Sequence, residues 1–173
     1  PIPAVRRDVL IIAGDATDNI YRLEELLSAM KQRFRWVGFV PGNHELWIRE
    51  KNQGDISFST SIDKFNAIIA MCNRIDVFTS PQQIGVGTSQ LWLIPLFSWY
   101  HGPEENPASL YAEKKCNQDR THEMWSDFFL TKWPKWEDGF TADYFLGLNK
   151  ARLEQEYNHP VLSFSHFLPL QEL

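Results

Sequence analysis

Three segments of the chain place side chains of metal-binding type directly after an apolar run. The segments are "AGDATD", "VPGNHE" and "FSHF". They contribute Asp15, Asp18, Asn43, His44 and His166. Carboxylate oxygens, amide oxygens and imidazole nitrogens all bind divalent metals, and imidazole also transfers protons near neutral pH. If the three segments meet in space, the pattern predicts metal-assisted chemistry in one pocket.

The first two apolar runs have the lengths of strands. Residues 8–13 are almost continuously apolar, as in a strand covered on both faces. Asn19 is a predicted cap for a helix that reaches about Arg33, and "RWVGFVPGN" after it predicts a second strand. The helix has an apolar stripe formed by Ile20, Leu23, Leu27 and Met30. Strand, helix and strand in this order predict a parallel pair, whose carboxyl ends share one sheet edge where ligands bind.

The rest of the chain continues the α/β pattern. A second amphipathic helix is predicted with Ile62, Phe65, Ile69 and Cys72 on one side. The remaining expected elements are strands at 75–80, 82–87 and 91–97, a helix at 142–157 and a strand at 161–166. Residues 98–141 have no clean period and are rich in aromatic residues and proline. Residues 1–173 are therefore expected to form a single domain with an aromatic-rich insertion at about 98–141, either a lid or a small core under a long loop.

Composition excludes several classes of partner. The chain has 173 residues and a net charge of −5, so no general polyanion-binding surface and no non-specific nucleic-acid binding are expected. No apolar run approaches the roughly 20 residues that cross a bilayer, and no signal pattern opens the chain. Cys72 and Cys116 lack metal-type spacing, which favours a reducing compartment, and a cytoplasmic location is expected. A disulfide between the two remains an open alternative.

The segments "GDATD" and "GNHE", with Asn43 28 residues after Asp15, resemble those of the calcineurin-like metallophosphoesterases. "SHFLP" is similar to the later histidine-bearing strand end of that family. The resemblance implies a four-layer αββα sandwich around two metal ions of Mn, Fe or Zn type. It also implies hydrolysis of a phosphoester by metal-bound hydroxide, with a phosphorylated small molecule or a nucleotide as substrate.

The resemblance also implies a role for each residue. Asp15 would bridge the two metals, and Asn43 and His166 would bind one of them. His44 would contact the phosphate and act as general acid toward the leaving group. Asp18 would accept a hydrogen bond from His44 and so favour its imidazolium form.

Two further family motifs, Asp-x-His and Gly-His-x-His, do not occur in the chain. They would precede Pro1 and follow Leu173, so we expect a fragment truncated at both ends that binds metal weakly and is itself inactive. The protein Ser/Thr phosphatase branch is disfavoured, because Asn19-Ile20 follows Asp18 where that branch has Arg-Gly. Glu45 makes the second motif GNHE, which leaves monoester and diester substrates open. A non-catalytic interaction scaffold with the same fold is the alternative function.

Each site residue also has a purely structural explanation. Asp15 could belong to a turn, Asp18 could favour a helix N-terminus, and Asn43 could be a left-handed turn residue. His44 could lie on the surface, and His166 could be a structural histidine. His101 and Tyr100, after the strand at 91–97, are candidates for the substrate rim, although Tyr100 could serve only in packing.

Overall fold

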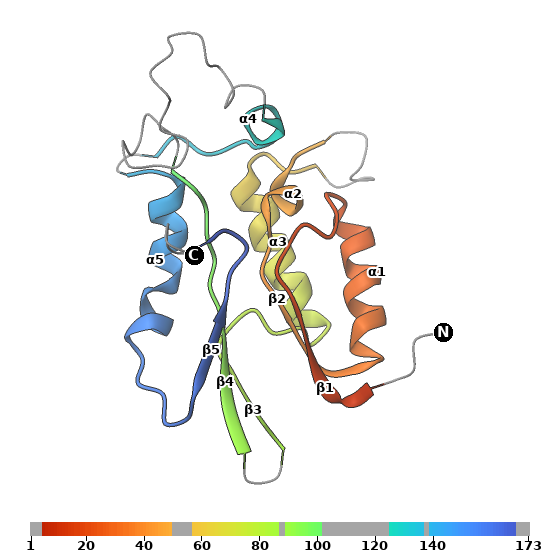
Figure 1. The fold of residues 1–173 in the computed structure, drawn as a ribbon. Helices are drawn as coiled ribbons and strands as arrows, with labels where there is room; N and C mark the ends of the chain where they lie inside the picture. Colours follow the sequence, from red (N-terminus) through yellow and green to blue (C-terminus); the bar gives the residue numbers. More distant parts are fainter. Residues whose placement is uncertain (1–4, 50–56, 87–88, 102–124, 137–138, 169–173) are drawn as a thin grey trace.

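The computed structural model describes residues 5–49, 57–86, 89–101, 125–136 and 139–168. In chain order the elements are β1 (Val5–Ile12), α1 (Ile20–Lys31), β2 (Phe34–Phe39), α2 (Asn43–Leu46), α3 (Ser61–Arg74), β3 (Gln82–Val86), β4 (Ser89–Pro95), α4 (Ser126–Leu130), α5 (Thr141–Glu154) and β5 (Val161–Phe164). Figure 1 shows α1 beside the β1–β2 pair and α5 beside the sheet of β3, β4 and β5. The α/β class predicted from the sequence is confirmed, and the four-layer arrangement stays a prediction.

The βαβ unit at the start of the chain forms as predicted. β1 and β2 pair in parallel, with Leu10 opposite Val37 and Ile12 opposite Phe39. Asn19 caps α1, because its side-chain oxygen accepts hydrogen bonds from the backbone N–H groups of Tyr21 and Arg22. Both strands therefore point their carboxyl ends toward the same edge of the sheet.

β1 itself differs from the expectation of a strand covered on both faces. The side chains from Val9 to Ile12 are only half-buried, and Asp8 is exposed. Leu10 and Ile12 pack against the core, whereas Val9 faces a groove described below. The strand is covered on one face only.

The second sheet has the order β3-β4-β5, with β3 and β4 antiparallel and β4 and β5 parallel. The strand predicted at 75–80 is wrong, because only Phe78 forms a bridge, to Gly38. Asp76 has a φ of 59°, in the left-handed region, where the chain turns out of α3. Pro81 has no backbone N–H to donate. The stretch between Asp76 and Pro81 is therefore too short to form a continuous ladder of strand hydrogen bonds.

The main core lies between α1, β2 and α3. Leu23 and Leu27 of α1, Phe39 of β2 and Ile68 of α3 are fully buried. Cys72 of α3 is free and lies in the same cluster. Burial raises the pKa of its thiol to about 12, so the thiolate form that reacts is disfavoured. In the part of the chain that the structure describes, no helix is long and apolar enough to cross a membrane.

The described parts of 98–141 pack onto this core. The rings of Trp99 and Trp133 lie 4.7 Å apart, and both lie near Phe145 of α5, whose ring contacts Phe65 of α3. This packing favours a core role over a lid for these parts, because the aromatic rings join the main cluster. Residues 102–124 and 137–138 of the expected insertion, and Cys116 with them, lie outside the described residues.

Candidate metal centre

The loops after β1 and β2 approach each other so closely that two glycines are required. Gly14 has a φ of +82°, and a Cβ there would lie 2.4 Å from the backbone nitrogen of Gly42. A Cβ on Gly42 would lie 2.4 Å from Asp15 Oδ1 and 2.7 Å from His166 Cε1. Asp15 itself has a φ of 59°, which is uncommon for a residue with a side chain. The two loops and His166 therefore lie in close contact, with no room for a side chain at either glycine.

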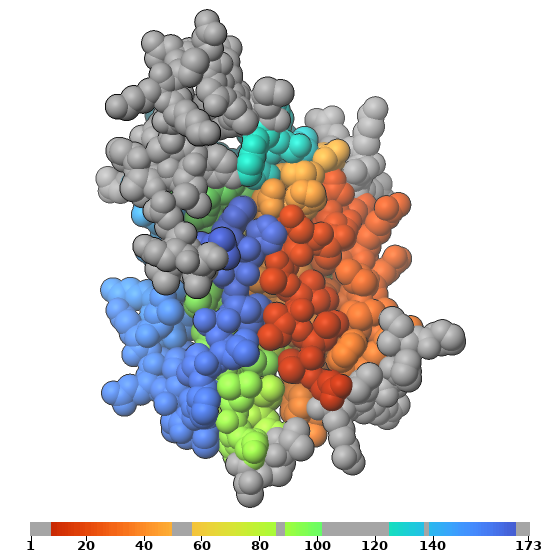
Figure 2. Space-filling model, viewed as in Figure 1, coloured from red at the N-terminus to blue at the C-terminus, as the bar shows by residue number. Residues whose placement is uncertain are grey.

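Asp15, Asn43 and His166 converge where these loops meet, as the sequence predicted. His166 Nε2 lies 3.0 Å from Asn43 Oδ1 and 3.4 Å from Asp15 Oδ1. Figure 2 shows the described N-terminal and C-terminal segments (red and blue) against each other on one face of the molecule. His166 of the C-terminal segment contacts Ala13 in the loop after β1. Asn43 is the first residue of α2, so the alternative of a left-handed turn residue is wrong.

The polarity of the three groups fits a cation. His166 Nδ1 lies 2.7 Å from the carbonyl oxygen of Ala13, which can only accept, so Nδ1 carries a hydrogen. In the neutral ring, Nε2 is then a lone pair that faces two oxygens, Asn43 Oδ1 and Asp15 Oδ1. Three acceptors directed at one another repel unless a metal ion lies between them or Nε2 itself carries a proton and donates to the oxygens. A backbone carbonyl that orients a histidine in this way is the usual second partner of a metal ligand.

No group of three or more His, Cys, Asp or Glu side chains suited to a metal occurs among the described residues. The cluster found here reaches three ligands only because the amide oxygen of Asn43 joins a carboxylate and an imidazole. Mixed oxygen and imidazole ligands suit Mn, Fe or Zn. The residues present therefore fit one metal ion, with the second oxygen of Asp15 left for another.

His44 lies beside the three ligands with its side chain 42% exposed. Its Nε2 is 3.8 Å from Asp15 Oδ2, and its backbone N–H donates to Asp15 Oδ1. The imidazole stacks on the ring of Trp47, with centroids 3.8 Å apart. The ring is thus held against Trp47 while its Nε2 faces Asp15 and the side chain stays partly exposed.

Asp18 has a described ion pair with Arg49 rather than with His44. Arg49 Nε lies 2.9 Å from Asp18 Oδ2. The contact is an ion pair without a hydrogen bond, because the Nε–H of Arg49 has no hydrogen-bond partner. Lys64, fully buried in α3, donates to the backbone carbonyls of Asp18 and Trp47. Burial lowers the pKa of the Lys64 ammonium to about 8, partly opposed by the carboxylates of Asp18 and Glu45. The hydrogen bond from His44 to Asp18 stays a prediction.

Glu45 is a residue of the centre whose role the sequence analysis missed. Its carboxylate is completely buried. Oε1 accepts from the backbone N–H groups of Ala16 and Thr17, and Oε2 accepts from those of Asp15 and Gly42. One side chain therefore ties both ligand-bearing loops together, and its place in "GNHE" was the available signal.

Asp127 of α4 is the second residue that the sequence analysis missed. Its side chain is buried and accepts hydrogen bonds from Asn43 Nδ2 at 2.8 Å and from Trp47 Nε1. The hydroxyl of Tyr100 donates to its other oxygen at 3.0 Å. No sequence signal marked Asp127, because it lies 84 residues from Asn43 in a segment without periodicity.

The two predicted rim residues have other contacts. Tyr100 reaches the centre through Asp127, and its ring packs against Trp99 and Phe167. His101 Nε2 lies 3.7 Å from Asp143 Oδ1 of α5. A role for either side chain in binding substrate stays a prediction.

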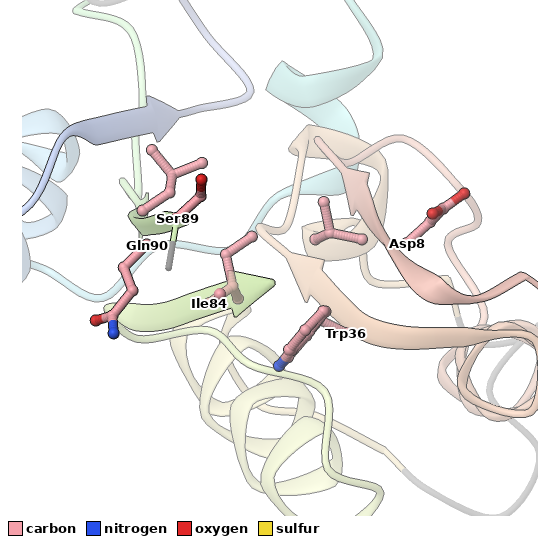
Figure 3. A pocket seen from close by; sticks show the side chains of 8 residues that line it. Asp8, Trp36, Ile84, Ser89 and Gln90 are labelled. Atoms are coloured by element: carbon pink, nitrogen blue, oxygen red, sulfur yellow. The ribbon is translucent and has the colours of Figure 1, made fainter. Parts of the chain in front are cut away.

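A groove of about 520 Å³ lies away from the centre, between the two sheets. Ile84, Ser89 and Gln90 line one side, and Trp36 and Asp8 line the other (Figure 3). None of the three converging ligands lines it. It belongs to the amino-terminal half of β1 and β2, whereas the ligands follow the carboxyl ends of β1, β2 and β5.

Comparison with known proteins shows the family of the chain. A family model described as calcineurin-like phosphoesterase matches residues 2–168. The [acyl-carrier-protein] phosphodiesterase PptH of Mycobacterium tuberculosis (strain ATCC 25618 / H37Rv) is 26% identical over 180 residues, which cover 98% of this chain and 53% of that protein. The crystal structure of the phosphopantetheinyl hydrolase PptH from M. tuberculosis has a similar fold, with a TM-score of 0.76 and 24% identity. The match covers 95% of this chain and 60% of the crystallised one, so the chain spans little more than half the length of these relatives.

Proposed function

Because the chain belongs to the calcineurin-like phosphoesterase family, we propose that it is a metal-dependent phosphoester hydrolase centred on Asp15, Asn43 and His166. The observation that carries the proposal is the convergence of the three ligand atoms, with His166 Nε2 at 3.0 Å and 3.4 Å from the two oxygens. Two ions of Mn, Fe or Zn type would supply a water of lowered pKa and neutralise charge on the phosphoryl oxygens.

Asp15 and His44 have different proposed roles at the centre. The two oxygens of Asp15 face different neighbours, since Oδ1 lies near His166 and Oδ2 lies near His44. This arrangement supports the bridging role that the family resemblance implies. His44 is the proposed general acid, because its half-exposed ring is held by Trp47 and can donate a proton from Nε2 to a leaving oxygen.

Phosphodiesters are the first substrate class to test, because the similar PptH is described as a phosphodiesterase. A phosphorylated small molecule or a nucleotide is the broader substrate that we propose. The finer choice between them depends on the side chains around the centre, among which Asp127 contacts Asn43 and Tyr100 contacts Asp127.

The experiment compares hydrolysis of bis(p-nitrophenyl) phosphate and p-nitrophenyl phosphate by the protein at its full natural length. We expect Mn²⁺ to support turnover, a chelator to abolish it, and His44→Ala to lower kcat by about 10²- to 10⁴-fold. His159→Ala is the matched control, because His159 lies between α5 and β5 outside the centre. Turnover that is indifferent to both chelator and His44→Ala would contradict the proposal. Metal binding without hydrolysis of any phosphoester would favour the interaction scaffold.

A further inference from the structure

Asp127 is a buried carboxylate, 2% exposed, directed at the candidate centre from α4. We propose that Asp127 is a positioning residue that holds the carboxamide of Asn43 with its oxygen toward the metal. The inference rests on the proposed metal site and adds a residue that the family motifs do not contain. It also gives α4 a direct role at the centre.

The polarity of the Asn43 amide follows from its contact with Asp127. A carboxylate only accepts hydrogen bonds, so the group that lies 2.8 Å from Asp127 Oδ1 must be the amide nitrogen of Asn43. The amide oxygen is then forced to the other side, where it lies 3.0 Å from His166 Nε2. Rotation of the amide by 180° would bring two oxygens together at Asp127 and would direct two N–H groups at the proposed metal site. Asp127 therefore selects the one orientation that can bind a cation.

The Asp127 carboxylate also holds Trp47, whose ring contacts the proposed general acid His44. Trp47 Nε1 donates to the oxygen that binds Asn43, and the Trp47 ring is the one on which His44 stacks. The hydroxyl of Tyr100 donates to the remaining oxygen. With three donors in place, Asp127 acts through its neighbours rather than as a ligand.

The backbone around α4 keeps Asp127 in position. Ile48 N–H donates to the carbonyl of Leu130, and Thr131 Oγ1 donates to the carbonyl of Asp127. The backbones of Ser61 and Lys132 are also joined, by a hydrogen bond from Ser61 N–H to the Lys132 carbonyl. The bonds of Ile48 and Ser61 fasten the segment around α4 to the chain just after α2 and to the start of α3, which supports a fixed carboxylate. A fixed partner is what an oriented metal ligand requires.

Two substitutions separate orientation from charge. Asp127→Ala removes every acceptor. Asp127→Asn can still accept from Asn43 and Trp47 with its amide oxygen, and its NH₂ can donate to the hydroxyl oxygen of Tyr100. If Asp127 works by orientation, the asparagine variant therefore rescues what the alanine variant loses. Asp76→Asn is the matched control, because Asp76 is exposed and pairs with Lys31 on the surface.

The first measurement is the affinity for Mn²⁺, determined by competition with a chelator, in the protein at its full natural length. We expect Asp127→Ala to weaken it by about 10- to 100-fold, as for other residues that orient metal ligands. We expect the Mn²⁺ affinity of Asp127→Asn to stay within about threefold of the wild-type value, because this variant keeps the hydrogen bonds and loses only their strengthening by the negative charge. Asp76→Asn should not change it.

The second measurement needs neither metal nor substrate. In metal-free protein, the side-chain NH₂ of Asn43, assigned by its loss in Asn43→Ala, should exchange slowly with solvent because Asp127 accepts one of its hydrogens. Exchange should become at least about tenfold faster in Asp127→Ala and remain slow in Asp127→Asn. If Asp127→Ala does not fold, as thermal unfolding would show, Tyr100→Phe replaces it. That variant frees one oxygen of Asp127, and it should speed the exchange by a smaller factor.

The outcomes separate this inference from the proposed function. Unchanged Asn43 exchange and unchanged Mn²⁺ affinity in Asp127→Ala would overturn the positioning role, even in an active hydrolase. An equal loss in Asp127→Asn and Asp127→Ala would also overturn it, because charge rather than orientation would then be the cause. A protein that hydrolyses no phosphoester, yet shows the expected exchange and affinity pattern, would refute the proposed activity alone.

Discussion

His166 Nε2 lies 3.0 Å from Asn43 Oδ1, although 123 residues separate the two in the sequence. Because His166 Nδ1 is engaged by the carbonyl of Ala13, the lone pair of Nε2 is directed at an oxygen that also carries lone pairs. Asp15 adds a third acceptor within 3.4 Å. This arrangement supports the proposed metal site, and the following predictions test it.

His166→Ala should weaken Mn²⁺ binding by more than about 100-fold, since a direct ligand matters more than the outer partners whose loss costs 10- to 100-fold. The measurement is chelator competition at constant pH. His159→Ala, between α5 and β5, should retain the wild-type affinity. Equal affinities in wild type and His166→Ala would remove His166 from the centre.

Gly42→Ala should damage both stability and metal binding, because its methyl group would lie 2.4 Å from Asp15 Oδ1. We expect the free energy of unfolding to fall by about 1–3 kcal/mol, as in other overpacked sites. Gly147→Ala in α5 is the opposite case, since nothing lies within 4 Å of the added methyl. It should stabilise the protein by about 0.5–1 kcal/mol. Urea unfolding measures the change in the free energy of unfolding for both variants. If Gly42→Ala does not change it, the close approach of the loops is disproved.

Glu45→Gln should lower the free energy of unfolding by about 2–3 kcal/mol, the cost of leaving buried donors unpaired. Each carboxylate oxygen of Glu45 accepts two backbone N–H groups. Whichever end the new NH₂ occupies, it therefore faces two donors. Glu25→Gln, on the exposed side of α1, serves as the control and should be close to neutral. The idea fails if chemical denaturation gives the same stability for both variants.

Lys64 should make stability rise with pH over the range from about 8 to 10.5. Burial lowers the Lys64 pKa in the folded protein from 10.5 to about 8, so within that range the unfolded chain binds more protons than the folded one. The free energy of unfolding then increases with pH. The advantage of wild type over Lys64→Met should grow across this range.

The control for Lys64 is Lys150→Met, on the exposed surface of α5. The difference between wild type and this variant should stay flat with pH, because an exposed lysine has a similar environment in both states. Denaturant unfolding at several pH values measures both differences. A flat profile for Lys64→Met as well would show that the ammonium is not desolvated.

Local chemistry in the sequence determined most of the elements and marked the candidate ligands. Capping and hydrophobic periodicity depend on residues close together in the sequence. For this reason the α1 cap at Asn19 and the parallel β1–β2 pair were predicted correctly. The carboxyl ends of neighbouring parallel strands must share one edge, so the meeting of Asp15 and Asn43 also followed from sequence. The strand expected at 75–80 failed, because a single left-handed residue, Asp76, redirected the chain.

Tertiary structure alone decided how those ligands are held. Glu45 and Asp127 are carboxylates like many others in the sequence, and only burial shows that their oxygens accept from the ligand loops and from the Asn43 amide. Trp47 as the partner of His44, and Arg49 as the described ion-pair partner of Asp18, likewise depend on contacts in space. A sequence motif specifies which atoms can bind a metal. The direction in which each atom points is set by hydrogen bonds to distant residues, and spacing along the chain does not encode them.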